Sequence, residues 1–484
     1  MKTLVVSEKK NAAKRIAELL GDGKVEETKS GGVELFKFKL NGDEMTSVGL
    51  RGHILKVDFP EEFSNWQETP PVALINAEIL KVPTLKTLVA ELKKQGKKAD
   101  EVIIATDYDR EGELIGSDAV HEIQSVNPDV PIKRARFSAL TKTEIRDAFS
   151  NLGPLSENLA HAGEARQDID LIWGATLTRF ISLASTRLGR QFLSVGRVQS
   201  PTLGLVVERE VERKAFVVET YWQLDGVFDG AGSRFEAGHK TERFSSKEEV
   251  EAIIKSLGKE GTVVGAKKTS RSTKPPAPFN TTSFLTAAAS VGVSPANAMR
   301  IAEGLYMKGL TSYPRVDNTV YPPSLGLRDI LETLKAAEEV GPLADEINKQ
   351  DKLVPTRGKK QATDHPPIHP TGAATKTRIT GNDWKIYELI VRRFLATLAQ
   401  PSQAESGRFD IDVNGEPFFI RGRRVTNEGW LKYYPYGQKK DDILPDLAKG
   451  DNVELVETKL EEKQTLPPAR YSQGALIQKM EELG

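Results

Sequence analysis

The chain has 484 residues, of which 38% are hydrophobic and 28% charged, a composition typical of a soluble globular protein with about three domains. It contains no cysteine, which excludes disulfides and cysteine-based zinc or iron–sulfur sites. No apolar run approaches the roughly 20 residues of a membrane span, and the N-terminus lacks a signal-peptide pattern, so we expect a cytoplasmic protein without a membrane partner. Lysine plus arginine equals aspartate plus glutamate at 68 each, which excludes a uniformly positive surface but not a local basic groove.

Strands and helices alternate in the first part of the chain. Asn41-Gly42 between two hydrophobic runs predicts a β-hairpin. Apolar runs predict buried strands at 3–6, 102–105 and 135–137. Helical spacing predicts helices at 13–20 and 85–92, a third helix that ends at about Gln124, and a fourth that begins at the capping residue Thr141. This alternation predicts a mostly parallel, doubly wound sheet.

Acidic residues follow two of these strands. Glu8 comes after the first strand, and Asp107, Asp109 and Glu111 come after the strand at 102–105. Working residues gather at the carboxyl ends of parallel strands, so these acids can face one crevice. Carboxylate oxygens in such an arrangement suit Mg²⁺. The alternative is a solvated acidic loop before a helix, where acids also favour the helix dipole.

Residues 160–216 are predicted to be helical and are rich in arginine. The loop 194–200 interrupts them with Gly196 beside polar groups, and it can offer backbone amides and Arg197 to a nucleic-acid backbone. A helix-capping loop with solvated charges is the alternative. Strands at 221–228 and 261–266 then predict an all-β part, broken at Asp229-Gly230-Ala231-Gly232.

Two helices, at 281–290 and from Ser294-Pro295 to about 305, are joined by a tight glycine turn and resemble a helix-turn-helix. Gly309 ends the second helix, and Leu310 begins a short strand that leads to Tyr313.

Tyr313 and Arg315 flank Pro314, and they are a candidate nucleophile and phosphate clamp. A phenol has a pKa of about 10, and a nearby guanidinium would favour the phenolate and hold a phosphate oxygen. Pro314 disfavours the helical region for Tyr313, so the ring is expected on an extended segment. A purely structural turn is the alternative.

Two of the six histidines lie in a proline-rich loop at 363–370, which suits either a positioned phosphate contact or a plain surface loop. The last part is predicted to form strands between 409 and 460 and a helix from Ala475 to Leu483. No G-x-x-x-x-G-K-[ST] sequence occurs, which excludes a P-loop ATPase or helicase unit.

Taken together, these motifs resemble those of the type IA DNA topoisomerases, on the side of archaeal topoisomerase I and topoisomerase III. The resemblance covers essentially the whole chain and is carried by these segments: 5–9, Gly52-His53, 105–115, 136–141, 196–201, 311–318 and 364–367. It implies a multidomain toroid of α/β, α and β parts. Two of its domains are continuous: a metal-binding Toprim domain with a doubly wound sheet (1–152) and a catalytic-tyrosine domain with the helix-turn-helix-like pair (276–401). The other two are discontinuous: a helical single-strand DNA-binding domain (153–216 and 430–484) and a β domain (217–275 and 402–429).

The resemblance also implies roles for single residues. Tyr313 would attack one DNA strand to form a 5′-phosphotyrosine without ATP, and Glu8 would be the general acid and base. Glu8, Asp107, Asp109 and Glu111 would hold Mg²⁺. Phosphate contacts would come from Lys9, Arg315 and His365, and the strand would lie in a groove of His53, Arg166, Asp170, Trp173, Ser194, Arg197 and Gln199. A monomer that relaxes negatively supercoiled DNA in contact with the nucleoid is expected, with RNA open as a second substrate.

Two departures from the family pattern stand out. Met307 occupies a position where many members have glutamate, so an acidic contact is either missing or supplied by another residue. The pattern also continues beyond Gly484, which indicates a C-terminal truncation. A Toprim nuclease or primase, which needs the acids but not Tyr313, and a non-catalytic single-strand nucleic-acid binder are the alternative functions.

Overall fold

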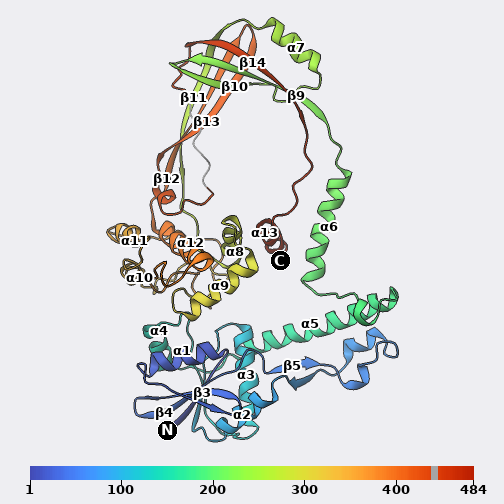
Figure 1. Cartoon of the computed structure of the whole chain (residues 1–484), viewed down its shortest axis with the longest axis vertical. Coiled ribbons are helices and arrows are strands. Elements are labelled where there is room, and N and C mark those ends of the chain that lie inside the picture. Colours follow the sequence, from blue (N-terminus) through green and yellow to red (C-terminus); the bar gives the residue numbers. More distant parts are fainter. Residues whose placement is uncertain (363, 438–444) are drawn as a thin grey trace.

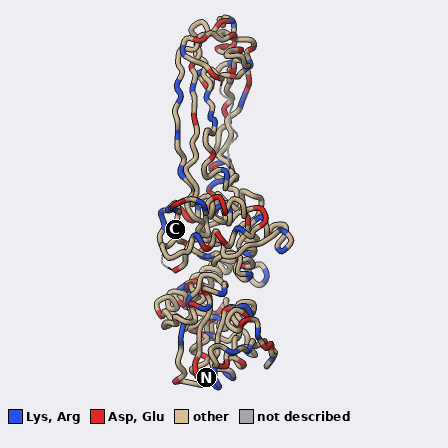
Figure 2. Tube along the Cα trace, turned by 90° about the vertical axis from the view of Figure 1, so that its left-hand side faces the viewer, with Lys and Arg blue, Asp and Glu red and all other residues tan. Residues whose placement is uncertain are grey.

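The computed structural model describes residues 1–362, 364–437 and 445–484. Thr363, at the start of the histidine loop, lies outside the described residues. Figure 1 shows the elements arranged as a ring, with the N-terminal sheet at one end and a β barrel at the other. Figure 2 shows lysines and arginines mixed with aspartates and glutamates in all parts of the trace, in keeping with the zero net charge. No helix among the described residues is long and apolar enough to span a membrane.

The N-terminal sheet has six strands in the order β2-β3-β4-β1-β7-β8. Strands β4, β1, β7 and β8 run parallel, whereas β2 and β3 are antiparallel to their neighbours, which confirms the mostly parallel sheet and the hairpin at Asn41-Gly42. The strand bounds are β1 Lys2–Ser7, β2 Glu26–Ser30, β3 Val33–Leu40, β4 Asp43–Gly49, β7 Glu101–Ile104 and β8 Ile132–Arg134, with a separate pair β5 Leu55–Asp58 and β6 Leu80–Pro83. The helices around them are α1 Lys10–Leu20, α2 Lys86–Gly96, α3 Arg110–Gln124 and α4 Lys142–Ser150, with short 3-10 helices at Glu61–Phe63 and Pro71–Asn76.

The strand predicted at 135–137 is wrong by three residues. Strand β8 ends at Arg134, where Arg134 and Gly153 exchange two backbone hydrogen bonds. Ala135 still donates its backbone N–H to the Ile104 carbonyl oxygen of β7 at 2.9 Å, whereas Phe137 lies beyond the strand and is buried in the core beside α4.

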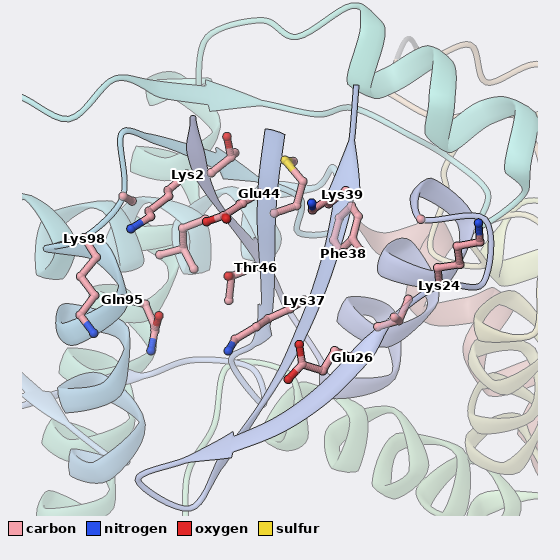
Figure 3. A pocket seen from close by; sticks show the side chains of 16 residues that line it. Lys2, Lys24, Glu26, Lys37, Phe38, Lys39, Glu44, Thr46, Gln95 and Lys98 are labelled. Carbon is pink, nitrogen blue, oxygen red and sulfur yellow. The ribbon is translucent and has the colours of Figure 1, made fainter. Parts of the chain in front are cut away.

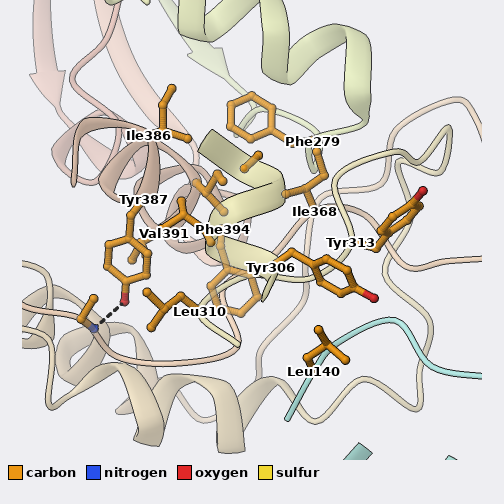
Figure 4. Close-up of a cluster of buried hydrophobic side chains, with 14 of the residues drawn as sticks. Leu140, Phe279, Tyr306, Leu310, Tyr313, Ile368, Ile386, Tyr387, Val391 and Phe394 are labelled. Carbon is orange, nitrogen blue, oxygen red and sulfur yellow. Dashed lines mark hydrogen bonds between the residues drawn. The ribbon is translucent and has the colours of Figure 1, made fainter. Parts of the chain in front are cut away.

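Each face of this sheet has its own core. Leu4 and Val6 point to the core that includes residues of α2 and α3, while Val5 points to the core that includes residues of α1 and α4. The second core continues without a break into the helices around the tyrosine segment, including Phe279 and Phe394. Figure 4 shows Tyr306 and Tyr313 in this continuous core, near Leu140 of the N-terminal part. The strand ends and the tyrosine segment are therefore held against each other by shared packing.

The tyrosine segment follows a pair of helices. Helices α8 Thr281–Ser290 and α9 Pro295–Met307 confirm the predicted pair, and Asn280 caps α8. Gly309 ends the turn after α9 with a φ of +68°, and a β-carbon there would lie 2.8 Å from the Leu140 carbonyl oxygen, so only glycine fits. In place of the predicted strand at Leu310, an extended segment pairs by a single bridge between Thr311 and Pro370. The other helices of this part are α10 Leu327–Leu334, α11 Gly341–Asn348 and α12 Gly381–Leu398.

Two long helices and a closed barrel complete the ring. Helix α5 Glu157–Ala184 leaves the N-terminal part, and α6 Gln199–Ala215, which has no buried residue, leads to the barrel. The barrel order is β10-β13-β12-β11-β14-β9. Its strands are β9 Thr220–Gly230, β10 Ser233–His239, β11 Glu260–Thr273, β12 Ser402–Val413, β13 Glu416–Asn427 and β14 Asn452–Gln464, with α7 Lys247–Ser256 beside them and α13 Gln473–Leu483 against α8.

Strand β14 corrects one predicted boundary. It pairs with β9 and β11 inside the barrel, so residues 452–464 do not belong with the helices, as the assignment of 430–484 had predicted. The physical reason is closure: without β14 the strands β9 and β11 would leave two unpaired edges.

Candidate active site

The predicted acids and the tyrosine line one cavity of about 370 Å³. Glu8 follows β1 and Asp107 follows β7, at the carboxyl ends of neighbouring parallel strands. The opposite wall comes from α9 and the tyrosine segment. The predicted residues that line the cavity are Glu8, Lys9, His53, Asp107, Asp109, Glu111, Arg166, Asp170, Tyr313 and Arg315.

Tyr313 is held by both parts of the molecule. Its backbone N–H donates to the Ser138 carbonyl oxygen at 2.8 Å, and its hydroxyl donates to Asp109 Oδ2 at 2.6 Å. Burial and the charges of Asp107, Asp109 and Glu8 raise the pKa of Tyr313 far above that of a free phenol. The predicted attraction between Arg315 and the phenolate is present, but burial and the nearby acids outweigh it, so Tyr313 stays a neutral hydroxyl.

Arg315 is turned towards an acid that the sequence analysis did not select. Its Nε and Nη2 donate to Glu303 Oε1 at 3.1 and 2.6 Å. Glu303 lies one helical turn before Met307 on α9, and both line the cavity. Glu303 therefore places an acidic group on the same face of α9 as Met307.

Asp107 is the most deeply buried acid of the site. Tyr306 donates from its hydroxyl to Asp107 Oδ1 at 2.9 Å. Burial, and then the nearby charge of Glu8, raise the pKa of Asp107 to about 8. The turn after Asp107 needs glycine at position 112, since a β-carbon there would lie 2.0 Å from the Asp107 carbonyl oxygen. Asp109 caps α3 by accepting the Gly112 N–H at 2.7 Å.

The donor set has the chemistry of a magnesium site. Glu8, Asp107, Asp109 and Glu111 offer only oxygen ligands to the same cavity, and burial together with the charge of Glu8 raises the pKa of Asp107. In the described part of the chain no group of three or more acids, histidines or cysteines is arranged closely enough to hold a metal ion. The residue types and their location fit Mg²⁺. Their side chains, however, form hydrogen bonds or ion pairs with other groups of the protein.

Glu111 is the clearest case of such engagement. Arg166 donates from Nη1 to Glu111 Oε1 at 2.7 Å, and His53 Nε2 lies 3.1 Å from Glu111 Oε2. Gln167 holds the other nitrogen of His53 at 3.1 Å. Two residues predicted to bind DNA are thus paired with a residue predicted to bind metal.

A similar pairing occurs further along α5, where Asp170 forms a two-point ion pair with Arg197. Trp173, on α5, is 50% exposed. Trp173, Ser194, Arg197 and Gln199 do not line the cavity itself, although Arg197 reaches it through Asp170.

His365 also lies outside the cavity lining, but it contacts the tyrosine. Its ring centroid is 4.9 Å from that of Tyr313, and its Nδ1 is 2.8 Å from Ser138 Oγ. Burial lowers the pKa of His365. Its Nε2 is buried and has no hydrogen-bond partner among the described residues.

Lys9, in contrast, lines the cavity, and its Nζ is 3.2 Å from Glu8 Oε1.

Comparisons with known proteins identify the family. A family model described as DNA topoisomerase matches residues 154–484, and one described as Toprim domain matches residues 3–140. DNA topoisomerase 1 of Archaeoglobus fulgidus is 46% identical over 484 residues, which cover 100% of this chain and 71% of that protein. The chain belongs to the type IA DNA topoisomerases. Human DNA topoisomerase 3-alpha is 32% identical over 100% of this chain and 50% of its own length. The structure of full-length topoisomerase I from Thermotoga maritima matches with a TM-score of 0.75 and 27% identity, over 99% of this chain and 75% of that chain.

Four residues of this topoisomerase cavity or its rim were missed from the sequence: Ser138, Gln167, Glu303 and Tyr306. Glu303, Tyr306 and Met307 follow the i, i+3, i+4 spacing of one helix face, directly before the tyrosine segment. That spacing is a signal that could have identified them. Ser138 and Gln167 act only through tertiary contacts, for which the sequence holds no comparable signal.

A larger cleft of about 860 Å³ lies elsewhere on the Toprim sheet and is not part of the topoisomerase site. Figure 3 shows that lysines and glutamates line it, among them Lys2, Lys37, Lys39 and Glu44. It includes Lys2 and Glu44 at the amino ends of β1 and β4, opposite the ends that carry Glu8 and Asp107. It contains neither the tyrosine nor the acidic turn.

Proposed function

We propose that this chain cleaves one DNA strand with Tyr313 as nucleophile, passes a strand through the break and reseals it without ATP. The observation that carries the proposal is the position of the Tyr313 hydroxyl, 2.6 Å from Asp109 in the cavity formed at the ends of β1 and β7. The missing P-loop agrees with an ATP-independent reaction.

In the proposed cleavage step, the Tyr313 oxygen attacks the scissile phosphorus and its proton passes to Asp109, its hydrogen-bond acceptor. A new oxygen–phosphorus bond forms on the 5′ side, and the bond to the 3′ oxygen breaks. Glu8 gives a proton to the leaving 3′ oxygen as general acid, and it takes the proton back when the strand is resealed. The phosphotyrosine bond conserves the energy of the broken phosphodiester, so resealing needs no nucleotide.

Positive and neutral donors would stabilise the charge that builds up on the phosphate. Lys9 lies beside Glu8, and Arg315 lies two residues after the nucleophile. Arg315 can exchange its Glu303 partner for a phosphate oxygen. His365, packed against the Tyr313 ring, has an unpaired Nε2 that is buried outside the cavity lining, so it would donate to the phosphate only when DNA binding exposes it.

Glu8, Asp107, Asp109 and Glu111 are proposed to hold Mg²⁺. When bound, the ion would supply positive charge that lowers the pKa of the buried acids and stabilises the phosphate. Glu111 becomes available for this role only when Arg166 and His53 release it.

The single strand is proposed to lie along His53, Arg166, Asp170, Trp173, Ser194, Arg197 and Gln199. Trp173 is exposed enough to stack on a base, and the arginines can exchange Glu111 and Asp170 for backbone phosphates.

Underwinding lowers the energy needed to open a duplex, so negatively supercoiled DNA is the preferred substrate. Equal relaxation of positively and negatively supercoiled circles at one salt concentration would contradict this. We further propose a monomer located at the nucleoid.

A denaturing gel with labelled single-stranded DNA tests the function. A 5′-phosphotyrosine leaves the 3′ fragment on the protein, so a 3′ label should migrate with the protein and a 5′ label should appear as a free, shortened strand. Excess chelator should abolish both products, and added ATP should change neither. Free fragments from both labels would indicate a nuclease, and no product from either would indicate a binding protein.

A further inference from the structure

Ser138 joins the Toprim domain to the tyrosine segment through two separate contacts. It lies in the loop between β8 and α4, where Glu144 accepts its backbone N–H. Its carbonyl oxygen accepts the N–H of Tyr313 at 2.8 Å, and its hydroxyl is 2.8 Å from Nδ1 of His365. One residue therefore touches both the proposed nucleophile and the proposed phosphate donor.

The environment of His365 makes the direction of the Ser138 contact important. The ring is 3% exposed, and burial keeps it neutral at neutral pH because it lowers the pKa. A neutral imidazole has one N–H and one lone pair, so the proton resides on either Nδ1 or Nε2. Only the Nε2–H form can donate from the nitrogen that has no partner among the described residues.

We propose that Ser138 is a positioning residue whose hydroxyl donates to Nδ1 of His365 and thereby keeps the ring proton on Nε2, the nitrogen that would donate to a phosphate oxygen once DNA binding exposes it. This inference rests on the proposed function, in which His365 contacts the scissile phosphate. If Nδ1 instead donated to the serine, Nε2 would present a lone pair to the phosphate and repel it. The hydroxyl of Ser138 contacts only His365 within the described residues, so nothing else there competes for its proton.

Ring-¹⁵N histidine NMR of the DNA-free chain tests the tautomer directly. The chain has six histidines, and the His365 signals can be assigned by their loss in His365→Gln. We expect a protonated Nε2 and a hydrogen-bonded Nδ1 in the unmodified chain. Ser138→Ala should move the Nδ1 signal to the position of a nitrogen without a hydrogen bond, and Ser138→Thr should keep it. A proton on Nδ1 in the unmodified chain, or an Nδ1 signal unchanged in Ser138→Ala, overturns the proposal.

Cleavage of a single-stranded oligonucleotide provides the second readout. Ser138→Ala leaves the backbone bond to Tyr313 in place, so we expect cleavage about tenfold slower with unchanged oligonucleotide affinity, and recovery in Ser138→Thr. Ser47→Ala is the matched control, since Ser47 is a buried serine of the same domain whose hydroxyl donates to Ala13 at 3.1 Å. Wild-type cleavage by Ser138→Ala overturns the inference. Failure of the unmodified chain to form any adduct would instead refute the proposed function, while the NMR result still decides the role of Ser138.

Discussion

The two sides of the site differ in how far water reaches them. The reacting side, with Asp107 at 6% exposure and Tyr313 at 5%, is enclosed between the Toprim sheet and the core around α9. The strand-binding side lies on α5 and in the loop that leads to α6, where the side chains of Arg166 and Arg197 are 40% and 36% exposed. Charges interact strongly on the first side and are screened on the second.

This difference explains how each side is built. Buried acids shift their pKa values and need partners, as the contacts of Asp107 with Tyr306 and of Asp109 with Tyr313 show. Exposed ion pairs contribute only about 0 to 1 kcal/mol to stability, so Arg166 and Arg197 can exchange an acid for a phosphate at little expense. Substitutions on the reacting side should therefore change chemistry, and those on the strand-binding side should change affinity and its salt dependence.

The largest effect is expected for Tyr313→Phe. The change removes one oxygen and keeps the ring packed against Tyr306 and His365, so the fold should persist. Covalent adducts and relaxation should both disappear, whereas single-strand affinity should stay within about tenfold, or roughly 1.4 kcal/mol. Adduct gels, plasmid relaxation and fluorescence anisotropy measure the three quantities. A denaturant-resistant adduct in this variant would contradict the assignment of the nucleophile.

A second prediction uses the pKa of Asp107, which burial and Glu8 raise to about 8. The folded chain holds the Asp107 proton at pH values above 3.8, the ordinary pKa of aspartate, at which the unfolded chain releases it. The free energy of unfolding therefore falls as the pH rises from about 3.8 to about 8. Mg²⁺ needs the ionised carboxylate, so its affinity should rise with pH by up to about tenfold per unit and level off above about pH 8. Calorimetric titration with Mg²⁺ between about pH 6 and 9 measures this.

Glu8→Gln provides a contrast for the magnesium titration. It removes the charge that helps to raise the pKa of Asp107, so the rise in affinity should move to lower pH. A magnesium affinity that stays constant across the range in the unmodified chain would show that Asp107 releases no proton on binding.

Much of the reacting side could be predicted from the sequence. The apolar runs before Glu8 and Asp107 are local signals, and the rule that acids gather at the carboxyl ends of parallel strands did the rest. The direction of the Tyr313 pKa could not be predicted. Arg315 is two residues away in sequence, but the acid that bonds the hydroxyl is 204 residues away, and only the tertiary fold places it there.

The errors in the fold have a similar origin. Phe137 is buried beyond the end of β8, and an apolar pattern records burial rather than hydrogen bonding. Residues 452–464 were predicted to be largely strand, but their partners β9 and β11 are about 200 residues earlier, so their place in the barrel depends on long-range pairing. Local propensity decides the element, and distant partners decide where it belongs.

A third prediction tests whether Glu303 belongs to the reacting side. Glu303→Gln replaces a charged acceptor of Arg315 with a neutral one of the same shape. Cleavage at saturating DNA should slow about fivefold because Arg315 is held less firmly, while single-strand affinity should rise about threefold because a negative charge leaves the cavity. Glu346→Gln, which breaks an ion pair with Lys432 in the same part of the chain, is the matched control and should change neither. Parallel losses in rate and affinity would indicate general damage instead of positioning.

The smallest effect is expected for Arg197→Ala, on the strand-binding side. Arg197 is exposed and pairs with Asp170, so its loss should leave stability nearly unchanged. Losing one phosphate contact should weaken single-strand affinity by about threefold to tenfold and reduce the slope of log affinity against log salt by about 0.7. The cleavage rate at saturating DNA should stay the same, because no group of the reacting side has moved. Arg190→Ala, an exposed arginine of the loop between α5 and α6, should leave affinity and slope unchanged. A drop in the saturated rate of Arg197→Ala would place Arg197 among the reacting groups and break the division between the two sides.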